Sequence, residues 1–120
     1  MFTRISALAA TCAALLVPQV AAAELKRVEI KTELIQLVQG NTLSRPLVRL
    51  QVAADGSIKG RGARWVFTGS WSWENGFFCR DLNWGGDDLG YNCQAVLADG
   101  SEMRFIADQG AGDSADFRLR

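Results

Sequence analysis

The stretch that decides the fold runs from Trp71 to Cys93 and reads WSWENGFFCRDLNWGGDDLGYNC. Asn75-Gly76 is the strongest short signal for a two-residue hairpin loop, because both central positions of a type I′ turn need positive φ. Gly85-Gly86, followed by two aspartates, marks a second reversal. We therefore predict three antiparallel strands joined by two tight turns.

A loop at Asn75-Gly76 pairs Glu74 with Phe77 and Trp73 with Phe78 across the first hairpin. Such cross-strand pairs of large side chains stabilise a sheet by roughly 0.2–1 kcal/mol each. On the following strand, side chains point alternately to the two faces. One face receives Phe78, Arg80, Leu82 and Trp84, and the other receives Phe77 and Cys79.

Cys79 and Cys93 are placed symmetrically about Gly86, the middle of the second turn. Directly opposed residues of antiparallel strands bring their Cβ atoms within about 5.5 Å, which is close enough for a disulfide. We predict a Cys79–Cys93 disulfide. Two thiolates without any histidine are a poor start for a four-ligand zinc site, so we expect no metal.

The first 23 residues have the pattern of a secretory signal peptide. Arg4 precedes an apolar run over 5–17, and Ala21-Ala22-Ala23 supplies the small residues of a cleavage site. The run is too short to span a bilayer as a helix. We therefore expect a periplasmic or secreted protein, with residues 1–23 removed and 24–120 forming a single domain. An oxidising compartment favours the disulfide.

The charge of the mature chain is nearly balanced, with 12 lysines and arginines against 13 acidic residues for a net charge of −1. No block of basic residues is present, so we expect no nucleic-acid partner. A second apolar run of spanning length is also missing, so we expect no membrane span after cleavage. We also expect a monomeric protein.

The mature chain begins with a helical pattern. Ile30, Leu34, Leu37 and Val38 recur on one helical face, and Gly40-Asn41 follows as a C-cap. This predicts a helix over about 28–39. A strand over 26–31 is the alternative, because Val28 and Ile30 also alternate.

The remaining chain has strand periodicity and hairpin signals. Runs over 48–53, 57–62, 64–68, 102–107 and 116–119 join the strands around Asn75-Gly76 and Gly85-Gly86, with Asp55-Gly56 and Asp99-Gly100 as further turns. We predict a mainly β, α+β fold of one helix and six to seven strands. The sheet forms a curled antiparallel meander or a small partly closed barrel, which hides most strand edges.

Four aromatic residues around the central stretch are candidate contacts for a partner or an apolar ligand: Phe77, Trp84, Tyr91 and Trp73. Both faces of a one-layer sheet cannot be buried equally, so one or two of these rings should be exposed. The alternative is that the helix covers the second face of the sheet.

Catalytic signals are weak. The chain has no histidine, which excludes Ser-His-Asp and Cys-His nucleophile systems, and it carries no phosphate-binding glycine motif. Asp81, Asp87 and Asp88 are the carboxylates that could bind calcium or act as an acid–base pair. The alternative is that aspartates at a turn bind their own backbone. We expect no cofactor.

Several strings resemble a family of small secreted alphaproteobacterial proteins: GNTL at 40–43, GSWSWENGFFCR at 69–80, Trp84-Gly85, and GYNCQ at 90–94. Some members are labelled dihydrodipicolinate reductase. The reductase that the label names is a two-domain cytoplasmic enzyme with a Rossmann site and catalytic lysine and histidines. This chain departs from that pattern in length, export signal and lack of histidine, so no catalytic residue is transferred.

The sequence therefore favours a small exported module without catalytic activity, binding an unknown envelope protein or a small ligand. A more specific form is an inhibitor of an enzyme that targets the cell envelope. The alternative is an enzyme, either a reductase acting on dihydrodipicolinate or a hydrolase that uses its carboxylates.

Overall fold

A computed structural model describes residues 24–120, and the predicted signal peptide lies outside this range. Its elements in chain order are β1 (Lys26–Arg27), α1 (Lys31–Val38), β2 (Leu43–Arg45), β3 (Val48–Val52), β4 (Ser57–Gly62), β5 (Trp65–Glu74), β6 (Phe77–Trp84), β7 (Asp87–Ala98), β8 (Glu102–Ile106), the 3₁₀ turn η1 (Asp108–Gly110) and β9 (Ser114–Leu119). No helix of this part of the chain is long and apolar enough to cross a membrane.

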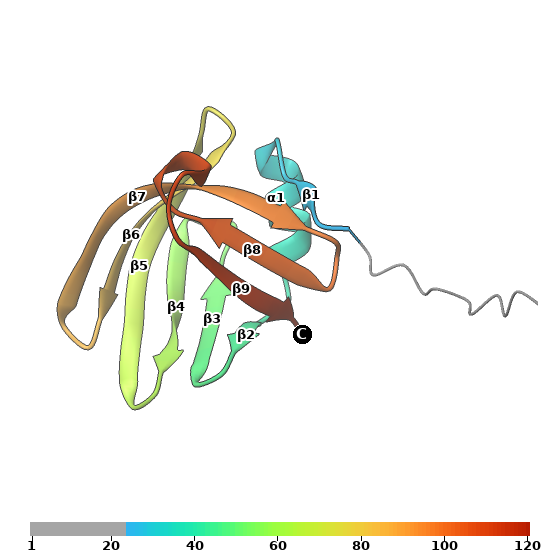
Figure 1. Cartoon of the computed structure of the whole chain (residues 1–120). Coiled ribbons are helices and arrows are strands. Elements are labelled where there is room, and N and C mark those ends of the chain that lie inside the picture. Colours follow the sequence, from blue (N-terminus) through green and yellow to red (C-terminus); the bar gives the residue numbers. More distant parts are fainter. Residues whose placement is uncertain (1–23) are drawn as a thin grey trace, which may run out of the picture.

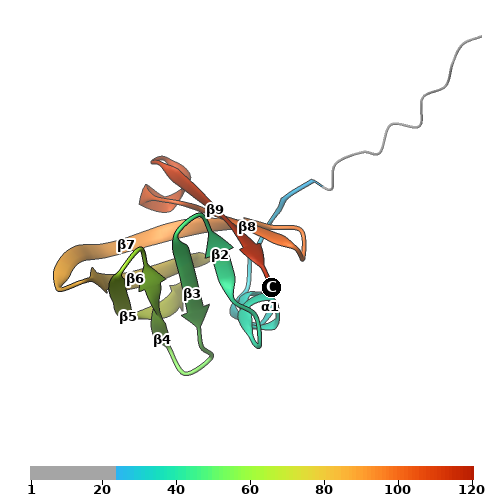
Figure 2. The same ribbon diagram turned by 90° about the horizontal axis from the view of Figure 1, so that it is seen from below.

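Strands β2 to β9 form a closed antiparallel barrel, and β1 adds to it as a ninth strand beside β7 (Figures 1 and 2). Closure occurs where β9 pairs with β2 and β8 pairs with β7. The prediction of one helix and an antiparallel curled sheet is confirmed. Residues 24–120 contain nine strands rather than six to seven, because β1 and β2 have only two and three residues and are too short to show a period.

The helix is shorter than predicted and begins at Lys31 instead of Val28. The backbone N–H of Val28 donates to the carbonyl oxygen of Val96 at 2.8 Å, so this residue continues the pairing of β1 with β7. Ile30 has an extended backbone and an exposed side chain. The free edge of β7 therefore takes up the first residues of the predicted helix, whereas Leu34 and Val38 are buried as the periodicity requires.

The central hairpins have the predicted register. Trp73 pairs with Phe78 and Glu74 with Phe77. Cys79 lies directly opposite Cys93 and forms the disulfide. The turn itself is centred between Gly85 and Gly86, half a residue before the symmetry point, and a bulge between Asp81 and Asn83 restores the offset.

The core fills the end of the barrel that α1 covers. The β3–β4, β5–β6 and β7–β8 turns lie at this end, and the β2–β3, β4–β5 and β6–β7 turns lie at the other (Figure 1). The most deeply buried large side chains are Leu34, Leu43, Met103, Val28, Val38 and Val96. Towards the middle of the barrel, four rings contact one another in the order Trp71, Phe78, Phe105 and Phe117, with centroids 5.3–5.7 Å apart. The helix therefore closes one end, while the other end stays open.

Acid should destabilise the fold through aspartates that accept hydrogen bonds. Asp99 accepts from the backbone N–H groups of Ser101 and Glu102 at 2.9 and 2.8 Å, and these bonds hold its pKa below the ordinary value of about 3.9. The pKa of Asp116 is also lowered, mainly by the hydrogen bond that Arg104 donates to its carboxylate. A depressed pKa contributes stability that is present above the ordinary pKa and lost as the pH falls through the folded pKa.

We therefore expect the urea midpoint to fall as the pH is lowered from about 5 towards 2. The Asp99→Asn variant should show a shallower fall, because one of the groups that resist protonation is removed. Urea titrations at several pH values measure both slopes. Equal slopes in the variant and the unchanged protein would contradict this assignment.

Candidate functional site

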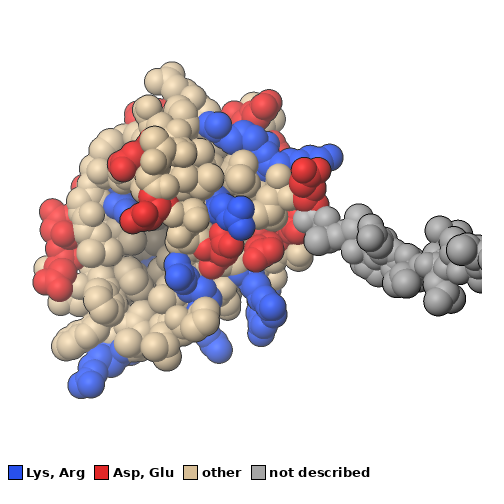
Figure 3. All heavy atoms as spheres, viewed as in Figure 1, with Lys and Arg blue, Asp and Glu red and all other residues tan. Residues whose placement is uncertain are grey.

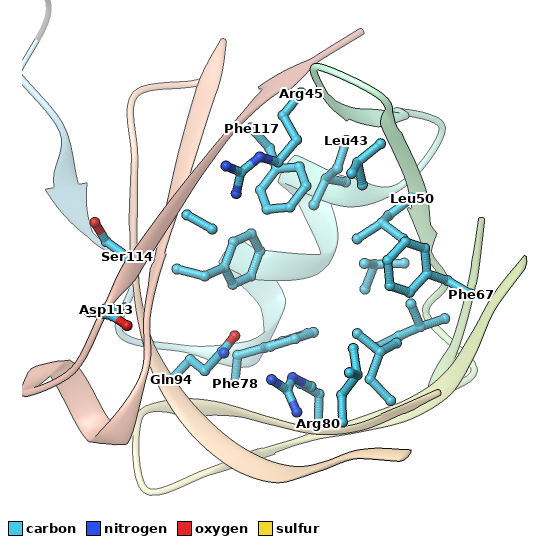
Figure 4. A pocket seen from close by; sticks show the side chains of 17 residues that line it. Leu43, Arg45, Leu50, Phe67, Phe78, Arg80, Gln94, Asp113, Ser114 and Phe117 are labelled. Atoms are coloured by element: carbon cyan, nitrogen blue, oxygen red, sulfur yellow. The ribbon is translucent and has the colours of Figure 1, made fainter. Parts of the chain in front are cut away.

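The open half of the barrel contains a cavity of about 360 Å³ (Figure 4). Its lining is apolar apart from five side chains. The apolar residues are Leu43, Val48, Leu50, Val52, Ile58, Phe67, Phe78, Leu82, Leu89, Phe105, Ala115 and Phe117, and the polar ones are Arg45, Arg80, Gln94, Asp113 and Ser114. A mainly apolar concave site with a few convergent polar groups is typical of small-molecule binding.

The wall of the barrel is incomplete beside this cavity. Strand β7 pairs with β8 only over Ala95–Ala98. Its earlier residues pair with β6 alone, so that stretch has no strand on its other side. The turn η1 closes part of this gap, since Asn92 donates from Nδ2 to Asp108 at 2.8 Å. The long β6–β7 hairpin thus forms one lip of the opening.

Arg80 reaches into the cavity from β6. Its Nη1 donates to the carbonyl oxygen of Gly90 at 2.6 Å, which orients the guanidinium towards the interior (Figure 4). Burial lowers the pKa of Arg80 from its usual value, because desolvation disfavours the charged form, while Asp81 acts in the opposite direction. The group remains charged, since an arginine stays protonated in proteins. Within residues 24–120 no carboxylate lies within 4 Å of it.

Arg45 points into the same cavity from β2, on the other side of the open space in Figure 4. Its guanidinium carbon lies 5.6 Å from the ring centroid of Phe117, a cation–π contact that holds the side chain over the apolar lining. Gln94 adds an amide from β7. The two arginines place positive charge at the edge of an apolar cavity from strands that are far apart in the sequence.

Strand alternation explains why these polar groups point inward. Arg80 lies in phase with Phe78 and Leu82, and all three line the cavity. Arg45 lies in phase with Leu43 on β2. The sequence contains a signal for each of these residues taken singly, because each arginine falls in phase with the apolar side chains of its strand. Nothing in the sequence showed that the two arginines belong to one site.

The four predicted aromatic contacts do not form one surface, and none of them lines the cavity. Trp84 stacks on Phe67 with centroids 5.9 Å apart and donates from its indole nitrogen to Gly62 at 3.0 Å. Phe77 lies half-buried on the outer face. The guanidinium carbon of Arg27 lies over its ring, 4.9 Å from the ring centroid. Trp73 packs half-buried against the core.

Tyr91 is the most exposed of the four rings. Its hydroxyl donates to Glu74 at 3.0 Å. This hydrogen bond to a carboxylate raises the pKa of Tyr91, because the charged phenolate would lose it. The ring therefore lies against the outer wall beside the disulfide, with its hydroxyl 3.4 Å from the sulfur of Cys93.

The three candidate carboxylates lie on the β6–β7 hairpin, and all are exposed. Asp88 accepts a hydrogen bond from the backbone N–H of Gly90 at 2.8 Å, which is the backbone contact expected of a turn aspartate. Asp81 faces outward and pairs with Tyr91. Asp87 is the first residue of β7 and pairs with Trp84. The cavity receives none of the three.

A group of Glu74, Cys79 and Cys93 has the proximity of a metal site. Both sulfurs are joined in the disulfide and carry no thiolate charge. The group therefore has one carboxylate available and does not have the ligands of a metal centre.

The cavity thus combines a concave apolar lining with the positive charge of two arginines, and we take it as the candidate ligand site. No family model, curated protein or solved structure matches this chain.

Proposed function

We propose that the protein binds a small amphipathic anion in the barrel cavity. The apolar part of the anion lies against the phenylalanine rings of the lining, and its acid group lies at Arg80. The observation that carries this proposal is the half-buried, unpaired guanidinium of Arg80 inside a cavity that is otherwise mainly apolar. A buried charge is costly unless it is paired. A ligand carboxylate, sulfate or phosphate would supply the missing partner.

The geometry of arginine favours an oxyanion as this partner. The guanidinium offers five donors in a planar fork, and the bond to Gly90 uses only one of its two terminal nitrogens. A charge-assisted hydrogen bond contributes about 1.5–3 kcal/mol. Arg45 lies across the opening and supports the same sign of charge.

The cavity volume indicates how much of a ligand the barrel can enclose. A water molecule takes about 30 Å³ in the liquid, so about 360 Å³ has room for about twelve non-hydrogen atoms. Decanoate is an acid of this size with an unbranched apolar chain. It is a probe of the chemical class, and its uncharged counterpart is 1-decanol.

Isothermal titration calorimetry with the delipidated mature protein tests the proposal. We expect decanoate to bind more tightly than 1-decanol and decyltrimethylammonium to bind weakest. The Arg80→Met variant should lose decanoate affinity by about ten- to a hundredfold, which corresponds to one lost charge-assisted bond. Its affinity for 1-decanol should change by less than about threefold, because the apolar lining is kept.

The matched control is Lys59→Met, which removes one positive charge from an exposed position of β4 outside the cavity. Its decanoate affinity should equal that of the unchanged protein. Equal affinities for decanoate and 1-decanol in the unchanged protein, or binding of neither, would overturn the proposal.

This proposal makes the small ligand, not an envelope protein, the occupant of the site. Export to the periplasm or the medium, an inhibitor role and the two enzymatic alternatives stay predictions. The reductase alternative has a direct test, because turnover of NADH or NADPH with dihydrodipicolinate by the purified mature protein would establish it.

A further inference from the structure

Two hairpin tips at the open end of the barrel carry exposed apolar side chains. Leu47 at the β2–β3 turn is 81% exposed, and Trp65 and Val66 at the start of β5 are 50% and 49% exposed. The tips are neighbours, because the backbone N–H of Ala63 donates to the carbonyl oxygen of Leu47 at 2.7 Å. Exposed apolar groups gathered at one end of a domain mark an interaction surface.

A row of basic side chains crosses the outer wall beside these tips. The strand register places Arg118, Ser44, Arg49 and Arg61 in line across β9, β2, β3 and β4, and Val66 follows on β5. Arg49 and Arg61 are direct cross-strand partners. Like charges directly opposite each other destabilise a sheet, so this pair costs stability unless an anion lies against it.

Few acidic groups lie near this row of basic side chains to offset its positive charge. The segments 44–49 and 61–66 contain four arginines and no acidic residue. Glu102 lies opposite Arg118 at the far end of the row, and Asp116 on the same wall is bound to Arg104. Within the described chain, neither Arg49 nor Arg61 has a carboxylate within 4 Å.

The acidic residues of the open end lie on the other lip. Asp87 and Asp88 are at the tip of the β6–β7 hairpin. Figure 3 shows the separation, with blue side chains along the lower edge, where the β2–β3 and β4–β5 hairpins end, and red ones at the left, over the β6–β7 hairpin. The β2–β3 and β4–β5 tips are therefore basic and apolar. The β6–β7 tip, whose Gly85 N–H donates to the carbonyl oxygen of Val66 at 2.9 Å, is acidic and carries one exposed apolar side chain, Leu89.

We infer that the β2–β5 side of the open end docks onto the surface of an anionic lipid bilayer. Arginines near such a surface are attracted to the lipid phosphates, and tryptophan prefers the interface between headgroups and acyl chains. Leu47 and Trp65 would enter this interface, and repulsion between the lipid phosphates and Asp87 and Asp88 would tilt the adjacent β6–β7 turn away from it. A purely acidic protein partner would use the arginines but would leave the apolar tips without a role.

Flotation with large unilamellar vesicles tests the inference. The mature protein should bind vesicles of phosphatidylglycerol mixed with phosphatidylcholine and should not bind pure phosphatidylcholine. Binding should weaken when NaCl is raised from 0.1 to 0.5 M, because salt screens exposed charges. The Arg49→Glu/Arg61→Glu variant should bind at least about thirtyfold more weakly, because it loses two attracted charges and gains two repelled ones.

The apolar contribution has its own variant, Leu47→Ser/Trp65→Ser, which should also lose binding while keeping all charges. Matched controls lie at the α1 end of the barrel. Lys26→Glu/Lys31→Glu changes the same amount of charge, and Ile30→Ser removes an apolar group that is 61% exposed. These controls should bind the anionic vesicles within about threefold of the unchanged protein.

Circular dichroism of each variant identifies any that fail to fold, and Arg49→Gln/Arg61→Gln then replaces the charge reversal. Arg80→Met should leave vesicle binding intact, so that failure of the cavity proposal and failure of the docking inference are distinguishable. Equal binding to both vesicle types, equal loss in the controls, or binding of polyglutamate with none to anionic vesicles would overturn the inference.

Discussion

Replacing Phe78 by alanine is expected to lower the free energy of unfolding by about 3–5 kcal/mol. The ring is 3% exposed and lies between two others, with centroids 5.4 Å from Trp71 and 5.3 Å from Phe105. Its loss removes buried apolar area and leaves space that the neighbouring strands cannot fill. Because small domains are stable by only about 5–15 kcal/mol, this single change consumes a large part of the stability.

The chain offers a matched control in the adjacent residue. Phe77 is the same residue type on the outer face of the same strand, where it is half-buried beneath Arg27. Phe77→Ala should cost less than about 1.5 kcal/mol, because much of its surface already faces water. Urea unfolding followed by tryptophan fluorescence measures both values. Similar losses in the two variants would show that the even-numbered face of β6 is not the buried one.

Removal of the disulfide is expected to cost about 3 kcal/mol. Cys79 and Cys93 are separated by 14 residues, and closing a loop of about 15 residues restricts the unfolded chain by roughly this amount in the chain-entropy model. The Cys79→Ser/Cys93→Ser variant should therefore unfold at lower urea. The hairpin that carries Arg80 should lose more protection from hydrogen exchange than the strands around α1, because the disulfide cross-links β6 to β7 within this hairpin.

Reduction provides the control. Dithiothreitol should shift the urea midpoint of the unchanged protein towards that of the serine variant and should leave the variant itself unaffected. Mass spectrometry after thiol labelling verifies the redox state of each sample. Two free thiols in protein isolated from its native compartment, or an unchanged midpoint after complete reduction, would contradict a stabilising disulfide.

Strand β6 contributes both to the stability of the fold and to the proposed binding site. Strand β6 supplies Phe78 to the core, Cys79 to the disulfide and Arg80 to the cavity in three consecutive positions. The hydrogen bond from Arg80 to Gly90 then ties the guanidinium to the partner strand of the hairpin. The disulfide one residue away should therefore help to keep Arg80 in its binding position, even though it faces the opposite side of the sheet.

The central hairpins were predictable because their determinants are local. Asn75-Gly76 fixes the turn, with both residues at positive φ of 52° and 82°, and the period of two then sets every pair as far as Cys79. The second hairpin shows the limit of this reasoning. Its cysteines are opposed as predicted, but this results from a turn at Gly85-Gly86 combined with a bulge that the sequence did not reveal.

The start of the helix was not predictable from the local pattern. Val28 and Ile30 fit both a helix and a strand, and the structure places Val28 against Val96, a residue 68 positions later. The free energy that decides between the two comes from this distant contact. The same holds for β2, which exists because β3 and β9 flank its three residues.

The sequence by itself determined a mainly antiparallel β fold, the register of the first central hairpin and the Cys79–Cys93 pair, because turn chemistry and strand alternation act between residues close in the chain. Only the tertiary structure decided that the barrel closes and that Arg45 and Arg80 share one cavity. It also placed Arg49 and Arg61 beside the apolar tips. These features depend on which strands meet across the barrel, and that pairing is set by packing between segments far apart in the sequence.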